Sequence, residues 1–204
     1  MSVEIHGTVS EGWEPIHEKF LSNFHSLGEL GASICITFEG ETVVDLWAGE
    51  SDTLGNPWNE DTIAVVNSCT KGAVALACHL LADRGLLDLD APVSEVWPEF
   101  AHGTKAAITN RMMLNHTTGV AAFREELPQG AAFDWDYMCD RVAAEEPWWS
   151  PGTRNGYHLM SFGWVAGELV RRASGKSLGT FFKEDVAEPS GADFWIGLPS
   201  EEHH

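Results

Sequence analysis

The chain has 204 residues and is 44% hydrophobic, a composition typical of a globular protein with a sizeable core. With 12 basic and 31 acidic residues, its formal net charge of -19 would repel a phosphate backbone and argues against nucleic-acid binding. The N-terminus has no basic, apolar leader, and no segment approaches the roughly 18 apolar residues of a membrane span. These features predict a soluble, cytoplasmic protein that does not bind a membrane.

The four cysteines, Cys35, Cys69, Cys78 and Cys139, are scattered along the chain. They form no C-x-x-C pair, and no histidine stands at zinc-ligand spacing from them. We therefore expect neither a disulfide framework nor a structural metal, and no cofactor is implied. The thiols are expected to be reduced and to lie in apolar surroundings.

The first third of the chain predicts one helix and two short strands. A helix ending near Gly28 or Gly31 would place on one face the apolar residues Trp13, Ile16, Phe20, Phe24 and Leu27. The β-prone runs ASICITF (32–38) and TVVDLWAG (42–49) follow, and Gly40 between them permits a tight hairpin turn. A third extended segment, TIAVVNS (62–68), then leads into the next helix.

From about residue 86 the sequence predicts short helices separated by turn residues, over 90–100, 108–120, 134–147, 161–175 and 177–191. Ser161 and Ser177 are typical N-cap residues, and Gly175 and Gly191 lie just past helix ends. The chain is thus expected to divide into residues 1–67, with the opening helix and sheet strands, and a mostly helical region, 68–204.

Lys71 stands three residues after Ser68, in the first turn of the helix that contains AVALACHLLA (73–82). That run is apolar except for His79, so we expect this helix to be buried nearly all round. Ser68 by itself fits a helix N-cap. A capping box, however, has Glu or Gln three residues later, because the positive end of the helix dipole favours acidic groups. Lys71 breaks this local rule, as residues at functional sites often do.

The spacing gives Ser68 and Lys71 a joint chemical use. Burial and the helix dipole both disfavour an ammonium, and a neutral amine is a base. Side chains three residues apart share one helix face, so Lys71 can take the hydroxyl proton of Ser68 and make the serine a nucleophile. The helix N-terminus also offers backbone N–H groups to the oxyanion that forms at an attacked acyl carbon. The competing motifs G-x-S-x-G and H-E-x-x-H are absent from the sequence.

A second cluster surrounds Tyr157, one of the 2 tyrosines, which follows a Pro-Gly turn. By itself, a tyrosine at such a place is typically a half-buried packing residue. Trp148 and Trp149 precede it, and they either wall an acyl pocket near Tyr157 or belong to the core.

Taken together, these stretches resemble the penicillin-recognising serine hydrolases: class C β-lactamases, D-alanyl-D-alanine peptidases and above all family VIII carboxylesterases. NSCTKGAVALACHLLADRGLLDLDAPVSEVWPEF is similar to the family's S-x-x-K helix and the G-x-L-x-L-D-x-P-V segment after it. ITNRMMLNHTTGV is similar to I-T-x-R-x-L-L-x-H-T-S-G, and SPGTRNGYH to P-G-x-x-x-x-Y-S-N. The resemblance implies an α/β (α+β) fold of the β-lactamase/transpeptidase type, with residues 1–204 as the N-terminal portion of a single domain.

The resemblance also implies residue roles. Ser68 is the acyl-accepting nucleophile, Lys71 its base, and Tyr157 the phenol or phenolate that moves a proton between Ser68 and the leaving group. His116 belongs to the family pattern too, but Gly119 at a helix end is a sufficient structural explanation of that run. We therefore leave His116 out of the catalytic set.

The chain departs from the family pattern at two places. Leu159 stands where Asn or Ser usually follows two residues after the tyrosine, which removes a polar contact to amide substrates and favours small esters. His158 either replaces that contact or is an exposed turn residue. The family's third motif, K-T-G, H-x-G or W-x-G on a downstream strand, is not found. The C-terminal strands of the sheet, the C-terminal helix and a second oxyanion N–H are therefore expected to lie outside this chain.

These features predict a serine hydrolase that forms an acyl-enzyme, most simply a carboxylesterase acting on small esters. One alternative is a β-lactamase or D-alanyl peptidase-like amide hydrolase. Another is a truncated or split, non-catalytic half that needs a second chain. An incomplete sheet would leave an unpaired edge, so a second chain or a second copy that completes the sheet is an expected partner.

Overall fold

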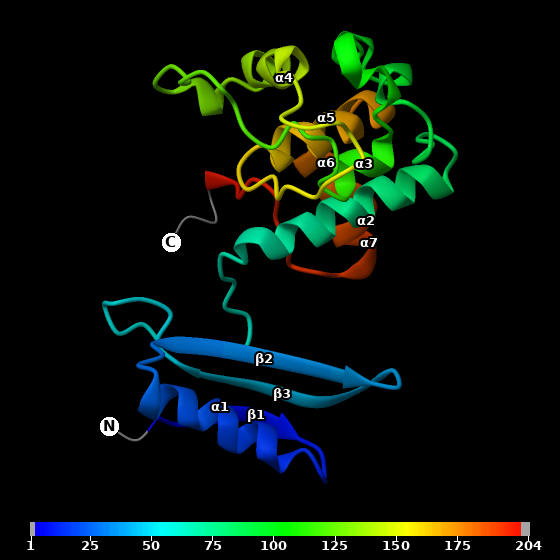
Figure 1. The fold of residues 1–204 in the computed structure, drawn as a ribbon. Coiled ribbons are helices and arrows are strands. Elements are labelled where there is room, and N and C mark those ends of the chain that lie inside the picture. Colours follow the sequence, from blue (N-terminus) through cyan, green and yellow to red (C-terminus); the bar gives the residue numbers. More distant parts are fainter. Residues whose placement is uncertain (1–2, 201–204) are drawn as a thin grey trace. The chain divides into compact units, whose positions relative to one another are not determined.

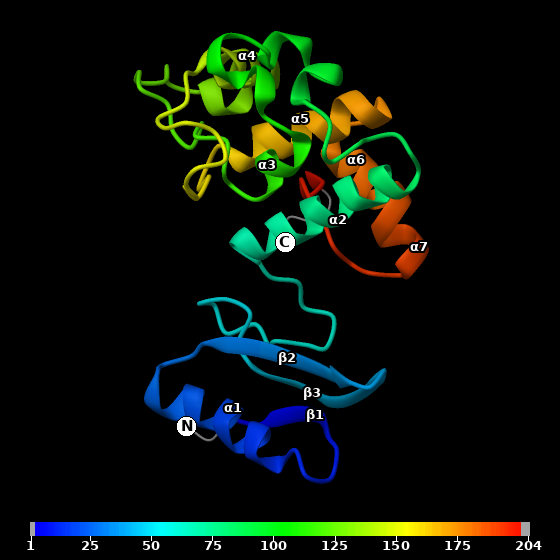
Figure 2. The same cartoon turned by 45° about the vertical axis from the view of Figure 1, so that its right-hand side comes forward.

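A computed structural model gives the fold and describes residues 3–200 (Figures 1 and 2). The chain divides between Val65 and Val66 into two compact units, here called the sheet unit and the helical unit. The expectation that both parts belong to a single domain stays a prediction.

The sheet unit contains β1 (Ile5–Val9), α1 (Glu14–Ser26), β2 (Gly31–Phe38) and β3 (Glu41–Gly49). The strands are antiparallel in the order β1-β3-β2, so β3 is central. Alternate residues of β3, Val44, Leu46 and Ala48, point to one face and pack against Phe20 and Phe24 of α1. The helix therefore covers one face of this small sheet (Figure 1).

The predicted helix and hairpin are confirmed, with differences at their ends. Glu39 and Gly40 both have positive φ, 51° and 87°, as a two-residue type I′ turn requires. Leu27 is 75% exposed because α1 ends at Ser26, one residue before it. Strand β1 is not predicted by the sequence pattern, since its middle residues are exposed and it forms through backbone pairing with β3.

The third extended segment, predicted over 62–68, is not a strand. Residues 62–66 have no regular structure, and Asn67–Cys69 form a 3-10 turn. A β-prone run becomes a strand only where another strand satisfies its backbone groups, and none of the described strands pairs with this segment.

The helical unit contains α2 (Thr70–Asp83), α3 (Asn110–Leu114), α4 (Trp135–Ala144), α5 (Phe162–Ser174), α6 (Leu178–Phe182) and α7 (Glu188–Ser190). A π-helical turn, Lys183–Ala187, joins α6 to α7. Besides Asn67–Cys69, the short 3-10 turns are Val93–Glu95, Pro98–Phe100, Gly103–Ala107 and Ala131–Phe133. The helix predicted over 90–100 is therefore two 3-10 turns.

Helix α5 is the central helix of this unit and is buried on two sides. Phe162, Ala166 and Val170 belong to an apolar cluster shared with α2 and α6. Val165 and Leu169 belong to a second cluster, which includes residues of α3 and α4. Figures 1 and 2 show α5 among these helices.

Within the helical unit, helix α2 buries one face, and the expectation of burial nearly all round stays a prediction. The buried residues, spaced by three and four, are Val74, Ala77, Cys78 and Leu81. On the opposite side Leu76 is 53% exposed and His79 is also exposed. An apolar composition permits burial, but the number of packed faces depends on neighbouring elements, and α2 contacts α5 and α6.

The predicted helix ends are confirmed at three of four residues. Gly175 and Gly191 end their helices in the left-handed region, with φ of 75° and 69°. The Ser177 hydroxyl accepts the Thr180 N–H at 3.1 Å. Ser161 has the N-cap position of α5, but its hydroxyl donates to the Ala121 carbonyl instead.

All four cysteines are free. Cys78 and Cys139 are buried, as predicted, but Cys35 and Cys69 are exposed. The prediction is wrong for these two because Cys35 alternates with the residues of β2 that face α1, and Cys69 lies in the turn before α2. Within residues 3–200, no helix is both long and apolar enough to cross a membrane.

Candidate active site

Ser68 and Lys71 are hydrogen-bonded to each other at the start of α2. Lys71 Nζ lies 3.0 Å from Ser68 Oγ. The serine does not cap the helix, because Cys69 has the N-cap position and no side-chain cap hydrogen bond is formed there. The N-cap alternative for Ser68 is therefore wrong, and its hydroxyl is available for chemistry.

The backbone turns sharply just before the serine. Asn67 has a φ of 44°, which Asn adopts more readily than most residues. The turn leads the chain from the irregular segment into α2 and leaves the Ser68 side chain exposed. The serine can therefore be reached by a substrate.

Tyr157 joins this pair from a loop far along the chain. Lys71 Nζ lies 4.8 Å from the centroid of the Tyr157 ring. The interaction with Ser68, and then that with Lys71, lowers the pKa of Tyr157 below its ordinary value. The structure thus brings together the three residues for which the sequence predicts catalytic roles.

Two further contacts hold Lys71 in place. Its Nζ lies 3.4 Å from the Leu159 carbonyl oxygen and 5.5 Å from the centroid of the Phe162 ring. Because Phe162 begins α5, the amine is held between the start of α2 and the loop that leads into the central helix.

An open pocket of about 340 Å³ lies beside Ser68 and Lys71 within the helical unit. Its apolar lining consists of Val74, Leu159, Met160, Phe162, Leu178 and Ile196. None of these except Leu159 is singled out by the sequence. Leu159 and Met160, at 65% and 71% exposure, are an apolar pair that follows Tyr157 closely in the chain. Their position could have indicated from the sequence that they line the pocket. Ile196 carries no local signal.

Trp148 and Trp149 do not line this pocket, contrary to the expectation that they wall it. The Trp148 Nε1–H donates to the Ala122 carbonyl at 2.9 Å. The Trp149 Nε1–H donates to the Arg154 carbonyl at 3.1 Å, and its ring occupies the space where Gly156 lacks a Cβ. Both rings therefore support the loops around the site, because their N–H groups are directed at backbone carbonyls.

His158 is fully buried, so its expected exposure at a turn is wrong. Its Nδ1 lies 2.8 Å from His116 Nδ1, and its Nε2 lies 2.9 Å from Thr118 Oγ1. Burial is the main cause that lowers the pKa of His158 to about 4. The ring is therefore neutral, and with both nitrogens engaged it does not replace the missing polar contact to a substrate.

Gly119 does not end a helix, because α3 already ends at Leu114. The glycine is explained by its φ of 80° and by the Trp149 carbonyl oxygen, 2.6 Å from where a Cβ would stand. The structural explanation that set His116 aside at the sequence level therefore does not apply.

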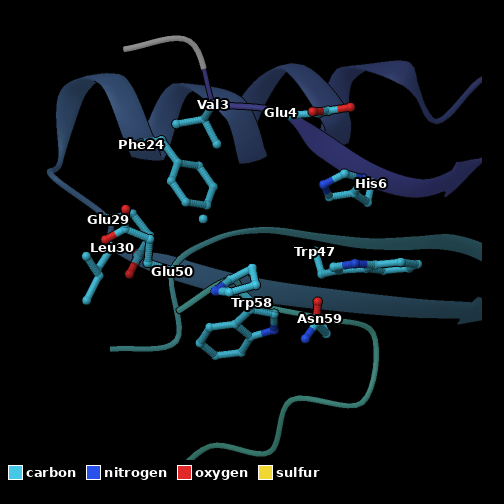
Figure 3. Close-up of a pocket in the computed structure, with 12 residues that line it drawn as sticks. Val3, Glu4, His6, Phe24, Glu29, Leu30, Trp47, Glu50, Trp58 and Asn59 are labelled. Carbon is cyan, nitrogen blue, oxygen red and sulfur yellow. The ribbon is translucent and has the colours of Figure 1, made fainter. Parts of the chain in front are cut away.

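A second pocket, of about 570 Å³, lies in the sheet unit (Figure 3). Figure 3 shows the rings of His6, Trp47 and Trp58 around it. Among the described residues that line it, there is no serine, threonine, cysteine or lysine. It therefore lacks a nucleophile and base like those of the helical unit.

Between residues 3 and 200 we also find no group of three or more His, Cys, Asp or Glu side chains that could hold a metal ion.

Comparison with known proteins gives consistent results. The family model described as Beta-lactamase matches residues 12–204. Esterase/beta-lactamase LipL of Mycobacterium tuberculosis is 38% identical over 171 residues, which are 83% of this chain and 39% of LipL. Esterase EstB of Burkholderia gladioli is 33% identical in an alignment of 183 positions that covers 79% of this chain and 45% of EstB. The chain thus spans less than half the length of these two relatives.

Solved structures resemble the chain over nearly all of its length. A family VIII carboxylesterase has a TM-score of 0.91 at 43% identity, over 98% of this chain and 56% of that one. A penicillin-binding protein homologue from Caulobacter crescentus has a TM-score of 0.93 at 41% identity, over 98% of this chain and 54% of that one. The predicted β-lactamase/transpeptidase-like fold is therefore confirmed, and the chain belongs to the beta-lactamase family.

Proposed function

We propose that the protein is a serine hydrolase that cleaves small carboxylic esters through an acyl-enzyme. The observation that carries this proposal is the 3.0 Å distance between Lys71 Nζ and Ser68 Oγ, with Lys71 Nζ also 4.8 Å from the centroid of the Tyr157 ring. A nucleophile, an amine and a phenol gathered at one site can pass one proton among them, as acyl transfer requires.

In the proposed mechanism, Ser68 Oγ attacks the ester carbonyl carbon and its proton passes to the Lys71–Tyr157 pair. Backbone N–H groups at the start of α2 stabilise the oxyanion of the tetrahedral intermediate. Tyr157 gives the proton to the alcohol oxygen as the bond from carbon to that oxygen breaks. Water then attacks the acyl-enzyme, its proton passes to the pair, and Ser68 Oγ is protonated again as the acid leaves.

Esters are favoured over amides because Leu159, which lines the pocket, offers no side-chain polar contact to an amide. The names of LipL and EstB, which include the word esterase, support the same substrate class. The name of LipL also includes beta-lactamase, so β-lactam hydrolysis is the second candidate. Comparing the turnover of a chromogenic ester with that of a chromogenic cephalosporin distinguishes the two.

The proposal is tested by labelling the full chain with a fluorophosphonate, which reacts with an activated serine. We expect one label on Ser68, detected by mass spectrometry, and none in Ser68→Ala. Ser190→Ala is the matched control, because that hydroxyl donates to the Val186 carbonyl and lies outside the pocket. A folded wild-type chain that takes no label would contradict the proposal.

We also consider that this chain hydrolyses esters only when a second chain, or a second copy of itself, completes the sheet. Among the described strands, β1 and β2 each pair only with β3, so both have an unpaired outer edge. Native mass spectrometry of the purified chain, together with ester turnover over a range of concentrations, tests this. Full turnover by a monomer would exclude the need for a partner.

A further inference from the structure

We infer that His116 is a positioning residue for Tyr157, and that it holds the tyrosine only while its Nδ1 carries no proton. The inference rests on the proposed function, because it concerns the placement of the residue that moves the proton. It is carried by the hydrogen bonds that run from Thr118 through His158 to His116.

The backbone on both sides of Tyr157 is bound to His116. The Gly156 N–H donates to the His116 carbonyl at 2.9 Å. The His158 N–H donates to His116 Nδ1 at 3.2 Å. The His116 ring also packs against the Tyr157 ring, with 4.9 Å between centroids. One residue thus contacts the tyrosine ring and both of its chain neighbours.

These contacts together favour one assignment of the ring protons, in which two donors share the lone pair of His116 Nδ1. Because His116 Nδ1 accepts the backbone N–H of His158, it carries no proton. The 2.8 Å contact between the two Nδ1 atoms therefore needs the proton on His158. His158 Nε2 must then accept, and the Thr118 hydroxyl donates to it at 2.9 Å. That hydroxyl in turn accepts the Val120 N–H at 3.0 Å.

Burial makes this chain of hydrogen bonds rigid. Thr118 and His158 are both 0% exposed, so neither can exchange its partner for water. Burial, and then the charge of Lys71, also lower the pKa of His116, which favours the neutral ring. A proton on His116 Nδ1 would oppose the His158 Nδ1–H and would remove both hydrogen bonds that the atom accepts.

The pH dependence of this arrangement depends on the groups around His116. Among the described residues, the titratable groups that contact it or act on its charge are Lys71 from α2 and Tyr157 and His158 from the loop before α5. Phe162 of α5 packs on the ring at 5.1 Å between centroids and is apolar. No carboxylate is among these groups, so nothing here stabilises a charged His116.

The test compares His116→Asn with His116→Ala in the full chain. Asn tolerates the φ of 65° at this position and places an amide oxygen near the Nδ1 acceptor, but it does not titrate. We expect His116→Asn to keep kcat within about threefold of the wild type at neutral pH, and His116→Ala to lose about 10²-fold in kcat with little change in KM. On the acidic side, wild-type kcat should fall before that of His116→Asn.

Ring nitrogen chemical shifts of the wild type give a measurement that does not depend on activity. We expect the Nδ1–H form of His158 and the Nε2–H form of His116, and any other assignment would overturn the inference. Unchanged kcat in His116→Ala, or an acidic limb shared by the wild type and His116→Asn, would overturn the positioning role alone. A wild type that takes no fluorophosphonate label overturns the proposed function, and this role with it.

Discussion

Lys71 and Lys105 are two lysines of the helical unit that differ in burial and in hydrogen-bond partner. Lys105, in the turn Gly103–Ala107, is 1% exposed, donates to the Ala143 carbonyl and lies 4.3 Å from the centroid of the Phe100 ring. Burial lowers the pKa of Lys105 to about 8, against the opposing charges of Glu146 and Glu145. Lys71 is only partly buried, but its amine touches Ser68 Oγ.

These two lysines show that burial of an amine does not by itself give it a partner for catalysis. Burial disfavours the charged form of any amine, and Lys105 shows this effect with a carbonyl as its hydrogen-bond partner and no nucleophile beside it. Chemistry needs a second group whose proton the amine can take, and only Lys71 of the two has a hydroxyl within hydrogen-bond distance. Three substitutions test this difference.

The largest effect is expected for Lys71→Met. Loss of the amine removes one of the two proton carriers, so ester turnover should fall by about 10³-fold while the free energy of unfolding changes little. Stopped-flow or steady-state ester hydrolysis measures the loss, and chemical denaturation checks the fold. Lys105→Met is the matched control and should keep turnover within about twofold. Equal losses in the two variants would contradict the distinction between these lysines.

A buried charge that is fully paired should behave differently from Lys105. Glu168 is 0% exposed and accepts hydrogen bonds from Arg171, Arg172 and Trp135 at 2.6 to 2.8 Å. Burial alone would raise its pKa, but these bonds outweigh burial and lower the pKa to about 2. Glu168→Gln should destabilise the fold by about 3 kcal/mol, because it removes the buried carboxylate that pairs with both Arg171 and Arg172.

The free energy of unfolding, from urea titrations, measures this loss. Because the folded-state pKa of Glu168 is lowered, its contribution is present above pH 4.5 and is lost as the pH falls towards 2. The wild type should therefore lose its advantage over Glu168→Gln across that range. Glu188→Gln is the control: its side chain is 59% exposed, with Lys183 Nζ 3.9 Å away, and it should change stability by less than about 1 kcal/mol. If Glu168→Gln leaves the free energy of unfolding unchanged, the ion pairs of Glu168 contribute nothing to stability.

The smallest effect is expected for Lys105→Met, and it should be a gain. Replacing a buried amine that is bonded to one carbonyl by an apolar chain of similar length should stabilise the fold by about 1–3 kcal/mol at neutral pH. The pKa of Lys105 is lowered from 10.5 to about 8, so the wild type gains stability as the pH rises through that window. Denaturation of both proteins from pH 7 to 10 should show their difference shrinking. If the difference in stability between the wild type and Lys105→Met does not depend on pH, the charged form of Lys105 does not destabilise the fold.

Prediction from the sequence succeeds where neighbours along the chain decide the structure. The hairpin at Gly40 and the helix end at Gly175 follow from local backbone preferences. The contact between Ser68 and Lys71 follows from helical spacing. Prediction fails for residues 62–66, because a strand needs a partner.

The sequence by itself therefore determined which residues are candidates for the reaction: a serine and a lysine three positions apart, and, through the family resemblance, a tyrosine. Only the tertiary structure decided how they are held. Tyr157 meets Lys71 because the loop before α5 is hydrogen-bonded back to His116. The same loop places Leu159 and Met160 in the pocket lining, which does not include Trp148 or Trp149. Local spacing fixes the contacts within one turn of helix, whereas packing between distant segments sets every other contact in the site.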